Sequence, residues 1–471
     1  MLSTAIVWFR RDLRLADHPA LDRARCDHDR IVPVFIDDAA AEGHWSAGAA
    51  SRWWLHHSLA ELDQRLRDRG SRLVLARGDA LESLRRIGNA CGADAVYWNR
   101  VYEPALVERD RVIKQALGED GLTVESCNGS LLFEPWQLRK NDGTPYRVFT
   151  PFWKQMQKRW TAPVACPEPR QLAAPNRWPA SLTLDDLDLL PRLGWADGFT
   201  DDWAPGELGA RRRLERFVEC TVVDYDVARD RPDQEGTSRL SPHLHFGEIS
   251  PGQVARALDE VGELPSGKGR WSFLREIAWR EFSSHLLFHY PYLPDQPLNP
   301  AFEAFPWRKR ADYAADLEAW QQGRTGIPMV DAGMRELWAT GWMHNRVRMI
   351  VASFLTKNLL IPWQEGARWF WETLVDADLA NNTQGWQWTA GCGADAAPYF
   401  RVFNPVLQGE KFDPDGRYVR RWCPELAGRK GRQIHQPIAQ SESRQYDYPM
   451  PLVDLKQSRR DALDAWQRIR S

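Results

Sequence analysis

The sequence predicts a doubly wound, Rossmann-like parallel α/β domain at the N-terminus, followed by an all-α domain. Short apolar, β-branched runs alternate with helical patterns over the first 130 residues, prolines interrupt residues 161–205, and helical patterns dominate beyond Gly206. Continuous apolar strands that alternate with helices are typical of a parallel sheet covered on both faces. We therefore expect an α/β domain at 1–130, an interdomain linker at 131–205 and an all-α domain at 206–471.

Five strands are expected in the α/β domain. The runs that predict them are Ala5–Phe9, Ile31–Ile36, Arg72–Leu75, Ala95–Trp98 and Thr123–Ser126. Leucines at 55, 59, 62 and 66 recur at helical spacing before Gly70, which ends that helix. The first strand continues as WFRRDLRLADHPAL, without a GxGxxG motif, so the ordinary dinucleotide fingerprint is absent.

The C-terminal half is predicted to be helical and contains a cluster of tryptophans. Eleven of the 24 Trp residues lie between Trp271 and Trp388. Because Trp is often used at interfaces and ligand platforms, this cluster indicates a site. The helical patterns are Ala210–Val223, Pro251–Val261, Ser272–His289, Pro328–Thr340, His344–Asn358 and Ala367–Val375.

The composition limits which classes of protein this chain can belong to. The 471 residues are 43% hydrophobic and 27% charged, which is typical of a soluble globular chain. Since 64 acidic residues balance 62 Lys and Arg, any nucleic-acid contact needs a local basic patch. The seven Cys form no CxxC pair, so we expect no metal site and a reduced cytoplasmic setting. No apolar run approaches the roughly 20 residues of a membrane helix.

Residues Glu235–Pro242 could bind an anion. Ser241 followed by Pro242 has the form of a helix N-cap with Pro at the first helical position. Three hydroxyls and Arg239 would then gather at a helix N-terminus, where backbone N–H groups and the helix dipole favour negative charge. The alternative is a simple capped turn.

The helical segment Trp271–Phe282 places three useful side chains within about one turn of one another. Glu276 and Trp279 could face a cavity while Arg280 pairs with an acid. The alternative is a surface Glu–Arg pair beside a core Trp.

The segment Gly341–Met349 combines an amide, a thioether and two guanidinium groups. Asn345, Arg348 and Met349 are expected to share one helix face, while Arg346 points elsewhere. Such a set suits a site that hydrogen-bonds the edge of a base and holds phosphate.

Two carboxylates, two Asn amides and two Trp lie within Asp376–Trp388. Asp376 and Asp378 could accept hydrogen bonds from hydroxyl groups of a ligand or pair with Arg348. No further acid or His is spaced to complete a divalent metal site. The alternative is a well-solvated loop.

Six segments, in this order along nearly the whole chain, carry a resemblance to a known family. They are VWFRRDLRLADHPAL, EGTSRLSPHLHFGEISP, WREF, GRTGIPMVDAGMRELWATGWMHNRVRMIVASFL, DLANNTQGWQW and APYFRVFNPVLQGEKFDP. Together they resemble the cryptochrome/photolyase family, and most closely its class I cyclobutane pyrimidine dimer (CPD) DNA photolyases. The resemblance implies an α/β domain that can hold a light-harvesting antenna and an all-α domain that buries a U-shaped FAD.

The resemblance also implies which residues hold FAD, whose reduced form would be active. Asn382 would face flavin N5, where an amide supplies no strong acid and therefore suits a reduced, anionic flavin. Phe273 stands where the family can have Trp. The full set is Tyr225, Thr237, Ser238, Arg239, Leu240, Ser241, Phe273, Arg280, Arg348, Asp376, Ala377, Asp378 and Asn382.

The implied substrate is a pyrimidine dimer in UV-damaged DNA. A dimer cannot be reached inside the base stack, and photolyases are among the enzymes known to flip their target out. Trp279 and Trp388 would sandwich the dimer, Glu276 and Asn345 would hydrogen-bond its edges, and arginines would supply the local positive patch. The residues implied for substrate and DNA are Arg229, Glu276, Trp279, Asn345, Arg346, Met349, Trp388, Arg401 and Gln408.

The implied reaction is light-driven. Excited, reduced FAD passes an electron to the dimer, two bonds of the cyclobutane ring break, and the electron returns, so no net redox change occurs. The implied catalytic residues are Glu276 and Asn382, with Trp307, Trp363 and Trp386 as the chain of Trp that carries electrons from the surface to oxidised FAD.

Three other functions are alternatives to light-driven repair. A photolyase-like cryptochrome, a blue-light sensor without repair activity, is the nearest; the intact dimer-pocket residues and the lack of a long tail past Ser471 favour repair. Photolyases for (6-4) photoproducts have His at the positions of Asn345 and Met349. A dark flavin oxidoreductase would need a nicotinamide site, for which we find no pattern.

The resemblance leaves the antenna site open among methenyltetrahydrofolate, a deazaflavin, another flavin and no chromophore. The segment WNRVYEPALVERDRV lacks the Asn-Glu pair expected of the best-known folate binders. A monomer is the family expectation.

Overall fold

The N-terminal domain is built on a parallel sheet. A computed structural model describes residues 2–261, 268–396 and 400–470, so the first three residues of the sixth motif, 397–399, lie outside the described residues. The sheet order is β3-β2-β1-β4-β5, with every neighbouring pair parallel. The five predicted strands are confirmed, as β1 (Thr4–Phe9), β2 (Arg30–Asp37), β3 (Val74–Arg77), β4 (Ala95–Asn99) and β5 (Thr123–Cys127).

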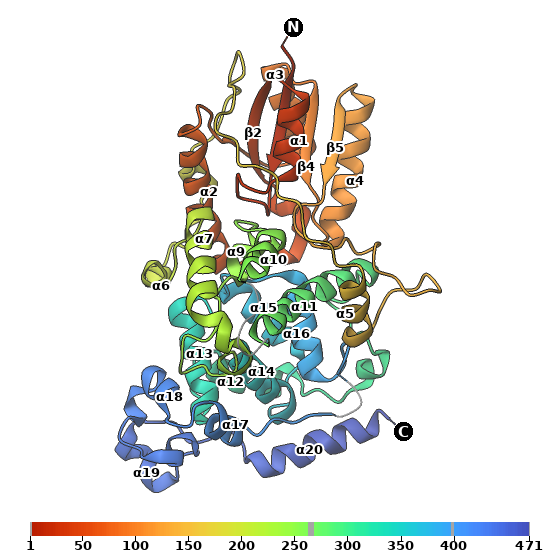
Figure 1. Ribbon diagram of the computed structural model, residues 1–471. Helices are drawn as coiled ribbons and strands as arrows, with labels where there is room; N and C mark the ends of the chain where they lie inside the picture. The colour runs from red at the N-terminus through yellow and green to blue at the C-terminus, as the bar shows by residue number, and fades with distance from the viewer. Residues whose placement is uncertain (1, 262–267, 397–399, 471) are drawn as a thin grey trace.

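Both faces of the sheet are covered by helices, as predicted (Figure 1). Along β1, Ala5, Val7 and Phe9 join the core under α1 and α2, while Ile6 and Trp8 join the core under α3 and α4. This alternation follows from the two-residue period of a strand, and both sets are apolar because both faces are buried. The helices are α1 (Pro19–Asp27), α2 (Ala49–Arg67), α3 (Ala80–Cys91) and α4 (Pro104–Glu119).

The predicted linker is largely irregular but includes a helix that belongs to the site. Its α-helices are α5 (Phe149–Lys158) and the short α6 (Phe199–Asp202). Between them the chain follows the α/β domain, where Leu172 N donates to Arg69 O (3.0 Å) and Leu182 N donates to Leu75 O (2.9 Å). The prolines of this stretch cannot donate backbone hydrogen bonds, which explains its lack of long elements.

The C-terminal domain is helical (Figure 1). Two predicted helices end earlier than expected, because π-helical turns, η4 (Phe217–Thr221) and η7 (Phe354–Asn358), follow α7 and α14. The solvated-loop alternative for Asp376–Trp388 is wrong, since Asp376 is buried and the residues from Leu379 onward form α16. The helices are α7 (Glu207–Arg216), α8 (Tyr225–Ala228), α9 (Ser241–His245), α10 (Pro251–Glu260), α11 (Gly269–His289), α12 (Arg310–Gln321), α13 (Pro328–Thr340), α14 (Asn345–Ser353), α15 (Trp363–Thr373), α16 (Leu379–Ala390), α17 (Pro405–Phe412), α18 (Arg417–Trp422), α19 (Gln440–Tyr446) and α20 (Leu455–Arg468).

The first two motifs meet at the junction of the domains. Leu13 N donates to Phe246 O (3.0 Å), and the Arg14 guanidinium donates to Gly247 O (2.8 Å). Gly247 has a φ of +63°, and a Cβ there would lie 2.2 Å from Arg11 O. Only glycine fits this close approach, which holds the segment after Ser241 against the α/β domain.

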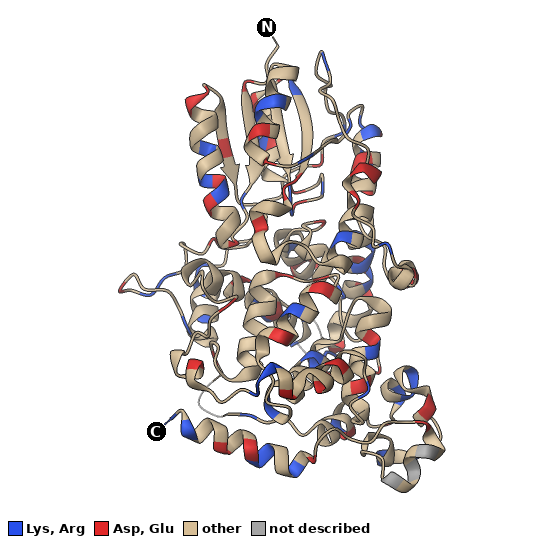
Figure 2. Cartoon of the chain, turned by 180° about the vertical axis from the view of Figure 1, so that it is seen from behind, with Lys and Arg blue, Asp and Glu red and all other residues tan. Residues whose placement is uncertain are grey.

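Charge is spread over both domains, with acidic and basic residues interspersed (Figure 2). None of the described helices is long and apolar enough to cross a membrane. Within 2–261, 268–396 and 400–470, no group of three or more His, Cys, Asp or Glu is placed to hold a metal ion.

Candidate functional site

Four helices bring the predicted site residues together. α11 packs against α8 and α16, and α14 packs against α16. Many of the residues predicted for FAD and for DNA therefore come from the same group of helices, although Tyr225 and Trp388 are 163 positions apart in the sequence.

The innermost ion pair joins Arg348 of α14 to Asp376. One guanidinium nitrogen lies 2.8 and 3.0 Å from the two carboxylate oxygens, and Arg348 Nε donates to Met343 O (2.7 Å). The Asp376 side chain is 3% exposed. This pairing was one of the roles predicted for Asp376, and it gives the site a fixed cationic group beside a buried carboxylate.

Asp378 caps the helix that carries much of the site. Its Oδ1 accepts hydrogen bonds from Asn381 N (2.9 Å) and Asn381 Nδ2 (2.8 Å), and its Oδ2 lies 3.3 Å from His245 Nδ1. Burial alone would raise the pKa of Asp378, but His245, Arg280 and the Asn381 amide hold it well below its ordinary value. Sequence reasoning missed His245 as a partner, although it lies within the second motif.

Asn382 follows on the same helix. Its side-chain nitrogen donates to Ala367 O (3.0 Å), which fixes the amide and leaves its oxygen as an acceptor. An acceptor at this place supplies no acidic proton, and the role of Asn382 at flavin N5 stays a prediction.

The loop Thr237–Ser241 differs from its predicted form. Helix α9 begins at Ser241 with Leu240 before it and no side-chain cap, so the predicted Ser241 N-cap is wrong. The Ser241 hydroxyl instead accepts a hydrogen bond from Trp342 Nε1 (3.4 Å). Ser238 Oγ accepts from Leu240 N (3.3 Å), so its proton can still be donated to an anion.

The remaining residues predicted for FAD line the same region. Tyr225 and Phe273 pack edge to face, with ring centroids 5.1 Å apart, and Leu240 and Ala377 are buried. Arg280 donates to the carbonyls of Ser130 (2.8 Å) and Leu244 (3.4 Å). Arg280 also pairs with Glu281 at 3.6 Å, so the predicted pairing with an acid is confirmed.

A second ion pair, between Arg229 and Glu276, lies on the side predicted for DNA. Each side chain is 28% exposed. Burial raises the pKa of Glu276, although Arg229 opposes the shift. The alternative of a Glu276–Arg280 surface pair is wrong, because Glu276 pairs with a residue outside its own helix.

The two tryptophans predicted to hold the dimer, Trp279 and Trp388, lie on adjacent helices and are half-buried. Trp279 stacks on Phe149 of α5, with ring centroids 3.6 Å apart and an interplanar angle of 7°. Phe149 N donates to Asp395 (3.0 Å), which anchors this support. No sequence signal pointed to Phe149, because the stack joins residues 130 positions apart.

The expected orientation of Arg346 is wrong. Arg346 lies 3.8 Å from Met349 Sδ, pairs with Asp230 (2.6 Å) and covers the ring of Phe412 at 4.5 Å. Residues 346 and 349 are neighbours on a helix surface at i, i+3, whereas Arg348 turns toward the interior. Asn345, at the start of α14, is exposed.

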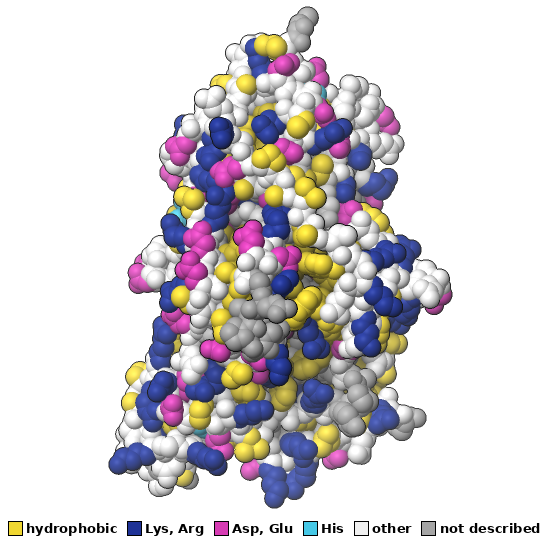
Figure 3. All heavy atoms as spheres, viewed as in Figure 1, with side chains coloured by type: hydrophobic (Ala, Val, Ile, Leu, Met, Phe, Trp, Pro, Cys, Tyr) yellow, Lys and Arg dark blue, Asp and Glu magenta, His cyan; other side chains and the backbone are white. Residues whose placement is uncertain are grey.

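Arg401 and Gln408 border this region. Arg401 is exposed, and its backbone carbonyl accepts a hydrogen bond from the buried Lys357. Gln408 is half-exposed on α17. Figure 3 shows hydrophobic side chains on this face of the helical domain with Lys and Arg side chains around them, an arrangement suited to a base within a phosphate backbone.

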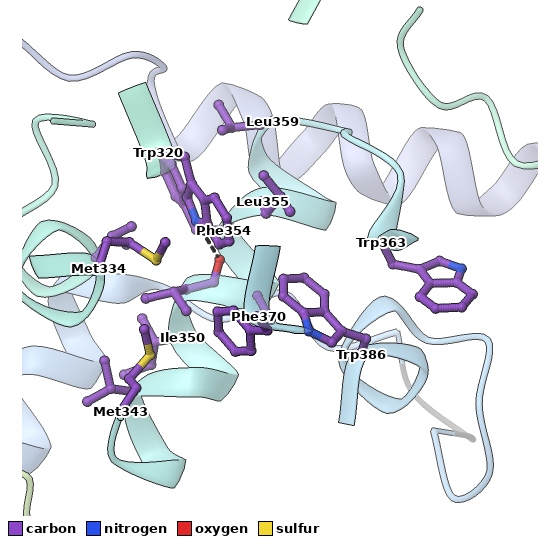
Figure 4. Packing of buried hydrophobic residues seen from close by; sticks show 14 of the residues in the cluster. Trp320, Met334, Met343, Ile350, Phe354, Leu355, Leu359, Trp363, Phe370 and Trp386 are labelled. Atoms are coloured by element: carbon purple, nitrogen blue, oxygen red, sulfur yellow. Dashed lines mark hydrogen bonds between the residues drawn. The ribbon is translucent and has the colours of Figure 1, made fainter. Parts of the chain in front are cut away.

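The three tryptophans predicted to carry electrons lie on or near α15. Trp363 is its first residue, and Trp386 lies on α16. Figure 4 shows Trp386 with Phe370 on one side and Trp363 on the other. Trp386 packs so closely on α15 that a Cβ at Gly366 would lie 2.0 Å from its ring. Trp307 is half-buried next to the segment that leads to Trp363, because the following residue donates its amide to Leu360 O (3.0 Å).

Comparisons with known proteins cover both domains of the chain. Residues 5–170 match a family model described as DNA photolyase, and residues 273–468 match the FAD binding domain of DNA photolyase. The chain is 47% identical to a deoxyribodipyrimidine photo-lyase of Agrobacterium fabrum over 99% of this chain and 98% of that one. It is 39% identical to Cryptochrome-2 of Arabidopsis thaliana over 99% of this chain and 79% of that one.

The crystal structure of a bacterial class III photolyase from Agrobacterium tumefaciens is also similar, with a TM-score of 0.95, 47% identity and coverage of 100% of this chain and 98% of that one. The expected assignment to class I is therefore not confirmed. The resemblance to the family as a whole is confirmed, and both domains are included in it.

Proposed function

Because the chain belongs to the cryptochrome/photolyase family and contains its FAD-binding domain, we propose that it is a carbon–carbon lyase that repairs cyclobutane pyrimidine dimers in DNA under light. The observation that carries the proposal is that α11, α14 and α16 pack together, since these helices bear both the FAD-side and the DNA-side residues. The name of the Agrobacterium fabrum relative supports the same substrate class.

The donor set fits FAD. Arg348, Asp376 and Asp378 offer fixed charges for the polar edge of an isoalloxazine, and Asn382 offers an amide acceptor. The hydroxyls of Thr237, Ser238 and Ser241 and nearby backbone amides would hold the diphosphate. When bound in its reduced form and excited by light, FAD supplies the electron that opens the cyclobutane ring and receives it back.

The protein's own contribution is binding, orientation and exclusion of water. Trp279, stiffened by Phe149, and Trp388 would hold the dimer between their rings. Glu276 would exchange its hydrogen bond with Arg229 for one with the dimer, and its raised pKa makes a protonated, donating carboxyl more accessible. Arg229 would then be free to meet a backbone phosphate, with Arg346 beside it.

The proposal is tested by illuminating the reduced protein with blue or near-ultraviolet light in the presence of a dimer-containing oligonucleotide. Loss of dimers that depends on light and on reduced FAD supports it. Unchanged dimers, with FAD bound and reduced, would contradict it. The same preparation tests a further proposal, an antenna in the α/β domain: an absorption band beyond those of FAD would support it, and an FAD-only spectrum would oppose it.

A second candidate is a photolyase-like cryptochrome, which the 39% identity to Cryptochrome-2 over nearly the whole chain favours. The dimer-side residues separate the two functions. A sensor would show light-dependent reduction of FAD without loss of dimers, and replacing Trp279 would leave its photochemistry unchanged. A repair enzyme would lose dimer binding in Trp279→Ala.

A further inference from the structure

A large cavity lies beside the Thr237–Arg239 loop, between α7, α13 and α18, which Figure 1 shows on one side of the helical domain. Its volume is about 290 Å³, and it opens to solvent. The described residues that line it include none from α11 or α16. It is therefore separate from the residues that would hold the flavin ring and shares with the FAD site only the loop.

The cavity has more positive than negative charge. Of its acids, Asp233 pairs with Arg231 (2.7 Å), and Glu235 pairs with Arg216 (2.6 Å). Burial raises the pKa of Glu336 to about 7, and its carboxyl accepts a hydrogen bond from the Tyr418 hydroxyl. The guanidinium groups that line the cavity belong to Arg213, Arg216, Arg239, Arg417 and Arg421.

Two of these arginines share one aromatic surface. Arg213 and Arg239 lie 4.7 and 5.3 Å from the centre of the Trp203 ring, and Arg239 also lies 4.6 Å from that of Trp342. Burial and the neighbouring Arg239 lower the pKa of Arg213 to about 10. Asp202, 3.7 Å from Arg239, is the one carboxylate within 4 Å of either in the described chain. An anion between them would relieve this repulsion.

A buried histidine lies in the wall of the same cavity. His344 is 3% exposed, and its Nε2 has no hydrogen-bond partner among the described residues. Its Nδ1 accepts from Arg346 N (3.1 Å), which places the ring proton on Nε2. Burial lowers the pKa of His344 to about 3, so the ring is a neutral donor. His344 therefore adds no positive charge to the wall of the cavity, and the arginines supply its charge.

We propose that this cavity binds a phosphate group of a small molecule while FAD occupies its own site. Arg213 and Arg239 grip the phosphate from one side, and Arg421 attracts it at the exposed rim. Guanidinium forks match phosphate oxygens in pairs. The phosphate is either free, as phosphate or pyrophosphate, or carried by a nucleotide, for which the neighbouring Phe217 ring offers an apolar contact.

The test uses the FAD-containing protein and isothermal titration with inorganic phosphate, pyrophosphate and ADP. We expect pyrophosphate binding to weaken at least tenfold in Arg213→Gln and severalfold in Arg421→Gln. Arg212→Gln is the matched control, because Arg212 is exposed on the same helix as Arg213 and does not line the cavity. Flavin absorbance should remain unchanged in all three. Tighter binding of ADP would assign the phosphate to a nucleotide, and equal binding would assign it to the free anion.

Three results would overturn the proposal. The first is no saturable binding of any of the three probes to the FAD-containing protein. The second is equal binding by the wild type, Arg213→Gln and Arg421→Gln. The third is loss of flavin in Arg213→Gln with anion binding only to flavin-free protein, which would make the cavity part of the FAD site. Because Arg421 is exposed, its variant decides the question if Arg213→Gln does not fold.

Discussion

The ion pairs on the two sides of the site are held differently. On the flavin side, Asp376 is 3% exposed and Arg348 is 24% exposed, and the carboxylate receives both of its short contacts from one guanidinium nitrogen. On the DNA side, the pairs Arg229–Glu276 and Arg346–Asp230 leave 18–35% of each side chain exposed. Breaking a buried pair leaves an uncompensated charge, whereas a partly exposed pair contributes little stability.

This difference suggests that the two sides of the site have different roles in binding. The flavin side is fixed before any ligand arrives, which suits electrostatic preorganisation around a cofactor. The pairs on the DNA side can be opened at small cost, so their arginines are available to phosphate and Glu276 is available to a flipped base. Four substitutions test the contrast, in order of decreasing effect.

The largest effect is expected for Asp376→Asn. The change removes the buried charge that faces the partly exposed Arg348, so we expect a loss of about 1.5–3 kcal/mol in the free energy of unfolding and weaker FAD retention. Urea unfolding and flavin absorbance measure the two effects. The matched change on the DNA side, Glu276→Gln, should cost about 1 kcal/mol or less. Similar losses of unfolding free energy in both variants would contradict the proposed difference between the flavin side and the DNA side.

The second prediction concerns Gly366, where the rigid flavin side continues toward Trp386. In Gly366→Ala the new Cβ would lie 2.0 Å from the Trp386 ring, so one of them must move. We expect a cost of about 1–3 kcal/mol and slower photoreduction of oxidised FAD.

The control is Gly385→Ala, one residue before Trp386 and on the same helix. A Cβ there meets nothing within 4 Å, so the change should be neutral or stabilise by about 0.4–1 kcal/mol. If both alanine variants photoreduce FAD at the wild-type rate, the packing of Trp386 on α15 is unimportant for this reaction.

Much of the scaffold follows from local patterns. The continuous apolar runs predicted all five strands, and helical spacing predicted α13 over the residues observed, Pro328–Thr340. The pairing of Arg348 with Asp376 was also among the predicted possibilities. These features depend on periodicity and on charge, which a sequence displays directly.

Other features of the site depend on tertiary contacts that no local pattern encodes. Ser241 is the first residue of α9 and does not cap it. Its hydroxyl accepts a hydrogen bond from Trp342, which is about 100 residues away in the sequence. Phe149 supports Trp279 from the predicted linker. Arg346 was misplaced because helix geometry puts it next to Met349, an error that a stricter use of the i, i+3 rule would have avoided.

The third prediction tests the DNA side through Glu276→Ala. Loss of a hydrogen bond to the dimer, and of the partner of Arg229, should lower the repair rate about tenfold, since such a bond contributes roughly 1–1.5 kcal/mol. FAD should remain bound, because Glu276 is not part of the fixed inner pair. Repair by steady illumination and flavin absorbance are the measurements, with the exposed Glu318→Gln as control. Loss of flavin absorbance would move Glu276 to the flavin side.

The smallest effect on the protein itself is expected for Arg346→Gln. Its partly exposed pair with Asp230 contributes little stability, so the unfolding free energy should change by less than about 1 kcal/mol. If Arg346 meets a backbone phosphate, affinity should fall equally for damaged and undamaged duplexes, and the slope of log K against log salt should become shallower by about one. The control is Arg310→Gln, whose side chain is 76% exposed on α12. An unchanged salt slope would show that Arg346 keeps its bond to Asp230 when DNA binds, and the exchange of partners would then be confined to Arg229 and Glu276.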